Sequence, residues 1–239
     1  MKKYLYLVVT ALVGCGVLLS SCSDDKIEGD SIFSTAPVHR NPFDQWLYKN
    51  YTMPYNIEFQ YRLKTEETDQ AYNFVPADSA KSVKLAILTK YMWFDAYAET
   101  VGLDFVKENS PRIIVVTGTP GYTRYRTEVI GSAEGGYKVR LGKVNALTDD
   151  QLKDYGSMTN YYFHTMHHEF MHILNQKKPY DESYDNISRS DYVSGNWTSI
   201  PDKKAQSMGF VSAYSMENPA EDIAELYSIY VTSTPQDWA

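Results

Sequence analysis

The sequence predicts an α+β fold with a small mixed sheet. Two observations carry this prediction: the candidate strands lie before residue 145, and helical patterns at 159–175 and after Asn218 follow them. Strands and helices that are grouped rather than alternating are typical of this fold class. With 239 residues, of which 43% are hydrophobic and 22% charged, the chain is long enough to fold as one domain with its own core.

The first long helix is expected at 78–101. Apolar residues recur there at three- and four-residue steps, Asp78 stands at its start, and Gly102 is a typical stop. The end of the chain predicts another helix, because the cap residue Thr234 is followed by Pro235. A helix that starts where the chain stops favours a missing C-terminal segment, and a frayed tail is the alternative.

Three segments have strand patterns of different kinds. Alternating apolar and polar residues predict a strand at 59–63, and the apolar run 113–116 predicts a buried strand. A hairpin is expected further along, with arms at 122–130 and 137–144 and a glycine-containing turn at 131–136 between them.

Residues 1–21 predict a lipoprotein signal peptide. Lys2 and Lys3 precede an uncharged, mostly apolar stretch that is too short to span a bilayer comfortably. Residues 19–22, Leu-Ser-Ser-Cys, match the bacterial lipobox, in which the cysteine is acylated. Cys15 fits the same pattern, but cleavage there would leave apolar residues exposed. We therefore expect lipidation at Cys22 and attachment to a membrane through the lipid.

Residues 22–42 predict a flexible tether, and residues 43–239 the folded domain. The Ser-Asp-Asp start at 23–25 resembles the export signal of surface lipoproteins in Bacteroidetes. This resemblance implies an outer-membrane protein that faces the cell surface. Acidic residues that are merely solvated are the alternative.

Charge and cysteine content exclude several classes of function. The net charge is −7 and no Lys/Arg run exceeds a pair, which argues against nucleic acid or an anionic membrane surface as the main partner. Both cysteines lie near the N-terminus, so a domain that begins after them has no thiol nucleophile. A Ser/His/Asp hydrolase stays open, but no Gly-x-Ser-x-Gly motif supports it.

The residues His-Glu-Phe-Met-His at 168–172 form an H-E-x-x-H motif inside the helix expected at 159–175. Helix positions four apart differ by about 40° in azimuth and about 6 Å in height, so His168 and His172 share a face. Two such imidazoles can bind one zinc ion, with Glu169 as general base beside an open coordination position. A solvated or buried histidine pair without a metal is the alternative.

Zinc needs a third protein ligand, and no histidine follows His172. A downstream carboxylate is therefore expected. Asn218 as a cap predicts a helix on which Glu221 and Glu225 lie four apart on one face. We expect Glu221 to be the third ligand, and Glu225 (or Asp222) to support a zinc histidine through its other ring nitrogen.

Alternatives to these assignments remain. Glu221 stands at a capping-box position and could simply hold the helix start. The competing carboxylates lie among turn residues beyond the motif helix: Asp181, Glu182 and Asp185. His164 and His168 are also four apart, but no glutamate lies between them at the motif position. His164 is therefore expected to pack against the site or support it.

The pairing of His168 and His172 with Glu-Asp-Ile-Ala-Glu at 221–225 is similar to the catalytic domain of the anthrax lethal factor type. In that type, a tyrosine seven residues before the ligand glutamate stabilises the oxyanion. Tyr214 stands seven residues before Glu221. The resemblance implies a catalytic role for Tyr214, and a packing tyrosine is the alternative.

From the lipobox to the 221–225 segment, the chain resembles zinc metallohydrolase lipoproteins of Bacteroidetes that are associated with TonB-dependent import systems of the SusC/SusD kind. Members usually continue past the point where this chain ends. The resemblance implies a zincin-like metalloprotease fold, with an active-site helix and a C-terminal glutamate-bearing helix. It also implies bound Zn²⁺, peptidase-like chemistry, an outer-membrane setting and an import complex as partner.

Together these observations predict a zinc-dependent hydrolase that cleaves peptide or other amide bonds. The alternative is a non-catalytic surface lipoprotein that binds peptide or glycan in an import complex and carries a structural zinc. Glu169 disfavours the alternative, because a structural site has no use for a carboxylate beside an open coordination position.

Overall fold

The computed structural model describes residues 39–64, 72–122 and 128–238, and the compact unit within it starts at Arg40. The predicted lipidation residue Cys22, the signal peptide 1–21 and most of the tether 22–42 lie outside the described residues, so these stay predictions. In the described part of the chain, no helix has the length and apolarity needed to cross a membrane.

A small mixed sheet lies at the centre of the fold, with the strand order β1-β2-β6-β5. Its strands are β1 (Glu58–Gln60), β2 (Ile113–Val116), β5 (Gly131–Glu134) and β6 (Lys138–Leu141). β1, β2 and β6 run parallel, and β5 is an antiparallel edge strand. The residues of one face are buried in the main core: Phe59, Ile114, Val116, Val139 and Leu141. The predicted α+β class with a small mixed sheet is confirmed.

The predicted hairpin is wrong in its first arm. Residues 131–134, which were assigned to the turn, form β5, while β4 (Glu128–Val129) pairs with β3 (Gly121–Tyr122) instead. The turn is made by Gly135 and Gly136, whose φ angles of 58° and 65° favour glycine. Gly131 is not a turn glycine: a Cβ there would come within 2.0 Å of Thr165 Cγ2, so only glycine fits.

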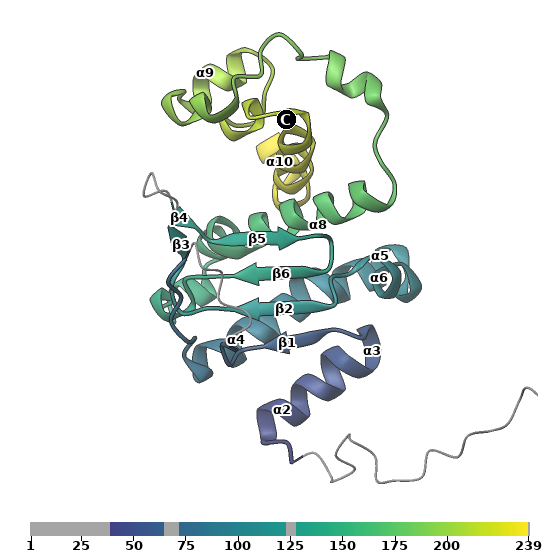
Figure 1. Ribbon diagram of the computed structural model, residues 1–239, viewed down its shortest axis with the longest axis vertical. Coiled ribbons are helices and arrows are strands. Elements are labelled where there is room, and N and C mark those ends of the chain that lie inside the picture. Colours follow the sequence, from purple (N-terminus) through teal and green to yellow (C-terminus); the bar gives the residue numbers. More distant parts are fainter. Residues whose placement is uncertain (1–38, 65–71, 123–127, 239) are drawn as a thin grey trace, which may run out of the picture. The chain divides into compact units, whose positions relative to one another are not determined.

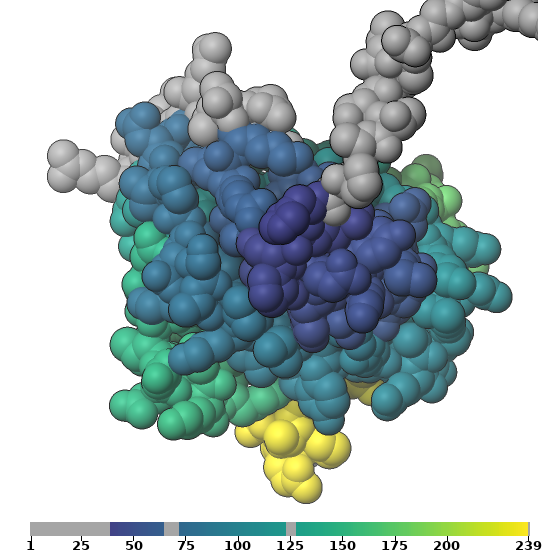
Figure 2. Space-filling view, turned by 90° about the horizontal axis from the view of Figure 1, so that it is seen from below, coloured from purple at the N-terminus to yellow at the C-terminus, as the bar shows by residue number. Residues whose placement is uncertain are grey.

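The helices before β2 begin with α2 (Pro42–Leu47), η1 (Tyr48–Thr52) and α3 (Met53–Tyr55). The predicted helix at 78–101 is confirmed as the continuous run of α4 (Ser79–Thr89), η3 (Lys90–Asp95) and α5 (Ala96–Val101). Asp78 caps it, and it ends at Gly102 with φ 97°. α6 (Leu103–Asn109) follows. Figure 2 shows the N-terminal helices, in purple and blue, at the centre of the face seen from below.

The elements after β6 carry most of the predicted site residues. They are η4 (Val144–Ala146), η5 (Gln151–Lys153), α7 (Tyr155–Met158), η6 (Thr159–Phe163), α8 (His164–Lys177), η7 (Glu182–Asn186), η8 (Ser194–Ser199), α9 (Asp202–Ser207), η9 (Tyr214–Met216), α10 (Pro219–Thr232) and α11 (Pro235–Trp238). The predicted helix at 159–175 is confirmed, since η6 and α8 form one helix.

Helix α8 lies between the sheet edge and the C-terminal elements. It packs against β5 on one side and against α10 on the other. Figure 1 shows β5 as the sheet strand nearest to α8, with α10 and α9 beyond it. The segment between α8 and α10 has a small core of its own, formed by Ala205, Phe210, Ala213 and Met216. The motif helix therefore has a strand edge on one flank and the glutamate-bearing helix on the other.

Candidate metal centre

The two motif histidines converge through their Nε2 atoms. They lie on one face of α8, as the four-residue spacing predicted, and the two Nε2 atoms are 3.1 Å apart. His168 is buried, with 6% of its surface exposed, and His172 is half-buried. Helical geometry alone brings these two atoms onto one side of α8.

Helix α10 brings a carboxylate to the same point. Asn218 caps this helix by accepting hydrogen bonds from the backbone N–H groups of Ala220 and Glu221, at 2.9 and 3.0 Å. The cap and Pro219 start the helix so that Glu221 lies in its first turn. Glu221 Oε2 lies 3.0 Å from His168 Nε2 and 3.3 Å from His172 Nε2. The Glu221 carboxylate therefore contacts both motif histidines and does more than cap the start of α10.

This donor set fits a zinc ion. A tetrahedral zinc with ligand bonds of about 2.1 Å separates its ligand atoms by about 3.4 Å, close to the 3.0–3.3 Å seen among the three atoms. Two imidazole nitrogens and one carboxylate oxygen are also the chemistry of catalytic zinc sites with three protein ligands. In the described residues, these three side chains form one of two groups compact enough to hold an ion.

Glu225 supports the first histidine from behind. Its Oε1 accepts from His168 Nδ1 at 2.9 Å, so that in the neutral ring the lone pair lies on Nε2 and is directed at the other ligand atoms. Burial would lower the pKa of His168, but the hydrogen bonds to Glu221 and Glu225 outweigh burial and raise it to about 9. Burial likewise opposes ionisation of Glu225, yet its histidine partners hold its pKa at about 2.

The alternative carboxylates are engaged elsewhere. Asp222 accepts a hydrogen bond from Tyr192 at 2.9 Å and contacts no motif histidine. Asp181 caps η7 through Ser183 N–H, and Asp185 accepts from the Tyr180 hydroxyl. Glu182 lines a separate cleft beside Tyr192 and Pro219. Of the carboxylates considered from the sequence, Glu221 and Glu225 are the two that the structure brings to the histidines.

Glu169 lies beside the three ligand atoms. The backbone N–H of Ala133 on β5 donates to its carboxylate, and partial burial raises its pKa although His168 and His172 oppose this effect. A carboxyl group with a raised pKa takes up a proton more readily, which suits a general base that must later return it.

Tyr214 approaches from the other wall of the cleft. Its ring stacks on His168 with centroids 5.6 Å apart, and Trp197 packs against it at 4.8 Å. Burial, together with the neighbouring Glu221 carboxylate, raises the pKa of Tyr214 well above its ordinary value. The phenol therefore keeps its proton at neutral pH and can act as a hydrogen-bond donor.

A cleft with two adjoining halves surrounds these groups. Both halves include Gly131, His168, Glu169 and Tyr214. The half of about 570 Å³ adds His172, Asn175, Tyr180 and Glu221, and the half of about 490 Å³ adds Ile130, His164, Trp197 and Glu225. These volumes lie within the roughly 300–1,000 Å³ of ligand pockets. A substrate chain that passes through both halves would cross Glu169.

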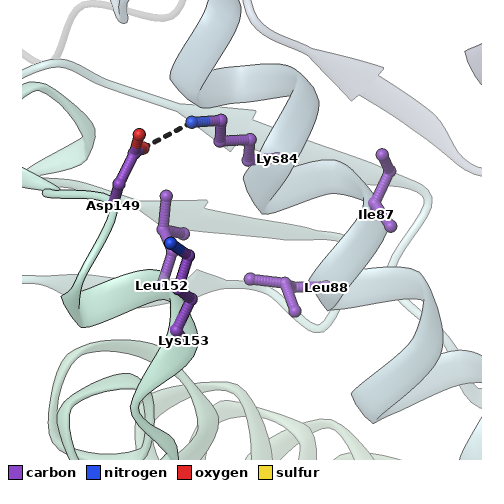
Figure 3. Close-up of a pocket in the computed structure, with 6 residues that line it drawn as sticks. All are labelled: Lys84, Ile87, Leu88, Asp149, Leu152 and Lys153. Carbon is purple, nitrogen blue, oxygen red and sulfur yellow. Dashed lines mark hydrogen bonds and ion pairs between the residues drawn. The ribbon is translucent and has the colours of Figure 1, made fainter.

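Another cavity lies between α4 and η5 and shares no lining residue with this cleft. Lys84 and Asp149 form an ion pair at its rim, and Leu88 and Leu152 line its apolar part (Figure 3). It contains no histidine or unpaired carboxylate, so it lacks the groups that are gathered in the α8–α10 cleft.

Four contacts in the site could not be predicted from the H-E-x-x-H motif. They involve Ala133, His164, Trp197 and Ser212. Ala133 and Ser212 have no chemical signature in the sequence. The four-residue spacing of His164 and His168 was a signal, but it did not reveal that Glu225 joins the two rings.

Comparisons with known proteins found a similar solved structure and a matching family. A solved structure described as a putative zinc-binding metallo-peptidase from Bacteroides caccae is similar over 87% of this chain and 78% of its own, with 40% sequence identity and a TM-score of 0.69. A search of curated proteins found no match. The family described as "Putative zinc-binding metallo-peptidase" matches residues 36–239. The chain belongs to this family, which is zinc-binding.

Proposed function

We propose that the protein is a zinc-dependent peptidase with a zincin-like site. The single observation that supports this most is the meeting of His168 Nε2, His172 Nε2 and Glu221 Oε2 within 3.3 Å, with Glu169 beside them. These three residues would hold the zinc. When bound, zinc supplies Lewis acidity: it polarises a carbonyl and lowers the pKa of water toward about 7.

The side chains of the cleft perform the remaining steps. Glu169 takes a proton from the attacking water and passes it to the leaving amine, while Ala133 N–H keeps its carboxylate in place. The Tyr214 hydroxyl donates a hydrogen bond to the oxygen on which negative charge develops. Glu225 holds His168 in the tautomer that directs Nε2 to the ion.

Strand β5 offers an edge on which a peptide could extend. Gly142 N–H bonds to Ile130 C=O, and with the β5–β6 register this makes 132/140 and 134/138 the hydrogen-bonded pairs. The backbone groups of Gly131 and Ala133 therefore point away from β6, toward the cleft. An extended peptide added along this edge would pass Glu169. The strand that would align the substrate is thus the revised first arm of the hairpin.

A chelator experiment tests the proposal. Purified protein is incubated with a mixed peptide library, with and without a chelator, and the products are identified by mass spectrometry. We expect cleavage that the chelator stops and added zinc restores. Full zinc occupancy without any cleavage would favour the non-catalytic binding protein instead, with Glu169 then lacking a role.

We further propose that the protein is lipid-anchored at Cys22 in the outer membrane, as part of a SusC/SusD-type import complex. The lipobox at 19–22 and the Ser-Asp-Asp start at 23–25 support this. Cys22→Ser should release the protein from the membrane fraction and abolish labelling by radioactive palmitate. Unchanged labelling would rule out Cys22 as the lipidation site.

A further inference from the structure

The carboxylate of Glu225 has three side-chain partners. Its Oε1 lies 2.7 Å from His164 Nε2 and 2.9 Å from His168 Nδ1, and its Oε2 accepts from Ser212 Oγ at 2.7 Å. The residue is 4% exposed. A buried carboxylate with three donors at these distances cannot rotate freely, because any rotation would break at least one short charge-assisted bond.

The three partners come from two different segments. His164 lies one helical turn before His168 on α8, so both rings reach the same oxygen from one helix face. Ser212 lies two residues before Tyr214, in the segment that leads into η9. Glu225 itself belongs to α10, one turn after Glu221. The Glu225 carboxylate therefore connects α8, α10 and the segment that leads into η9, which carries Tyr214.

We propose that His164 and Ser212 are positioning residues, which hold Glu225 so that it orients both His168 toward the metal and Tyr214 toward the substrate. The expected effect of these residues on catalysis rests on the proposed function. Their expected effect on metal binding can be measured without turnover.

The donor count supports this assignment. Ser212 has a single hydroxyl proton, and its Oγ also accepts from Ser215 N–H at 3.2 Å. Since Glu225 can only accept, that proton goes to Glu225, and the contact of 3.3 Å with Ser215 Oγ must be donated by Ser215. Losing the Ser212 hydroxyl would therefore remove one hydrogen bond between the Tyr214 segment and α10 and leave one carboxylate oxygen without its donor.

His164 makes the corresponding contribution on the other oxygen. It donates from Nε2 to the same Oε1 that receives His168 Nδ1–H. Without His164, the carboxylate could turn away from His168, and the ring of His168 would lose its fixed orientation. Partners of this kind typically contribute 10–100-fold to metal affinity or activity.

The experiment for His164 uses metal binding. We compare His164→Ala and His164→Gln by zinc affinity in chelator competition and by the visible spectrum of the Co²⁺-substituted protein, which reports on ligand geometry. We expect a roughly 10–100-fold loss of affinity and a changed spectrum for His164→Ala, with partial rescue by His164→Gln, which keeps an N–H donor. His167→Gln is the matched control: it replaces a ring that contacts Tyr97 rather than Glu225 and should leave the spectrum unchanged.

Two results would overturn the role of His164. The first is wild-type affinity and spectrum in His164→Ala. The second is two metal ions per wild-type molecule and one per His164→Ala molecule, since His164, His168 and Glu225 are also compact enough to hold an ion. That result would assign them a second metal site.

The experiment for Ser212 uses the link to Tyr214. Ser212→Ala should lower kcat by about 10–100-fold with little change in KM, and Ser212→Thr should restore it. In a Tyr214→Phe background, Ser212→Ala should cost much less, because only its effect on His168 through Glu225 remains. A full additional loss in that background would contradict the link. If the wild type shows no turnover, the proposed function fails, and a crystal structure of Ser212→Ala decides this step. A Tyr214 ring still stacked on His168 would then refute the role of Ser212.

Discussion

At the scale of single residues, the carboxylates of the cleft differ by their partners. Glu221 faces two imidazole nitrogens, Glu225 faces two imidazoles and a serine, and Glu169 faces a backbone N–H. Burial raises the pKa of Glu169, whereas histidine partners hold the pKa of Glu221 and Glu225 below their usual values. These environments match the proposed roles of Glu221 as ligand, Glu225 as support and Glu169 as base.

Glu169→Gln tests the base. The substitution keeps the shape of the side chain but removes its ability to take a proton, so we expect kcat to fall by about 10²–10⁴-fold with zinc content unchanged. Steady-state kinetics and metal analysis measure the two quantities. Glu128→Gln is the control, because Glu128 lines the same cleft but pairs with Lys143. Full activity in Glu169→Gln would refute the role of the base.

Glu221→Ala tests the third ligand. We expect a loss of zinc affinity larger than the roughly 10–100-fold typical of a residue that only supports a ligand. Glu182→Ala and Asp185→Ala should keep wild-type affinity, because these residues lie away from the histidines in the structure. Zinc retained at one ion per molecule in Glu221→Ala would move the ligand to another carboxylate.

At the scale of elements, the contact between β5 and α8 decides whether the strand edge reaches the site. Gly131 lies directly against Thr165, and Ala133 N–H reaches Glu169 from the same strand. Any residue larger than glycine at 131 would have to displace either the Thr165 methyl group or the strand itself. The close packing of β5 against α8 therefore depends on Gly131 having no side chain.

Gly131→Ala should destabilise the protein by about 1–3 kcal/mol, as is typical of overpacking, and lower activity by displacing β5. Thr165→Ser removes the methyl group that the new Cβ would meet, so the double variant should recover part of the lost stability. Thermal unfolding and peptidase assays measure both effects. A double variant no more stable than Gly131→Ala alone would contradict this explanation.

The elements also show where sequence patterns succeed. The helix at 79–101 was predicted because its apolar spacing, cap and stop are local signals, and the same is true of Asn218 and Pro219 at the start of α10. The hairpin was misplaced because Gly131 has the same sequence signature as a turn glycine, although helix packing is what requires it.

At the scale of the whole molecule, a zinc ion held by the proposed ligands would link α8 to α10. Ligands from both helices bind only in the folded chain, so zinc should raise the melting temperature, and a chelator should lower it again. Differential scanning calorimetry with stoichiometric zinc measures this effect. No change in melting temperature at full occupancy would mean that the ion does not join the two helices.

The zinc effect should grow as the pH rises. Without metal, the raised pKa of His168, about 9, means that its pairing with carboxylates stabilises the fold fully below about 6.5 and is lost as the pH rises through about 9. Zinc must displace that proton, so its affinity increases over the same interval. The melting-temperature difference between zinc-loaded and zinc-free protein should therefore widen from pH 6.5 to 9. A constant difference would contradict this coupling.

What the sequence by itself determined is local. The spacing of His168 and His172 on one helix, and of Glu221 and Glu225 on another, follows from helical periodicity, and the cap at Asn218 follows from short-range hydrogen bonding. What only the tertiary structure decided is how segments far apart in the chain meet: Ala133 with Glu169, and Ser212 and His164 with Glu225. Such contacts depend on how strands and helices pack, and packing is set by the shape of the whole core rather than by any short stretch of residues.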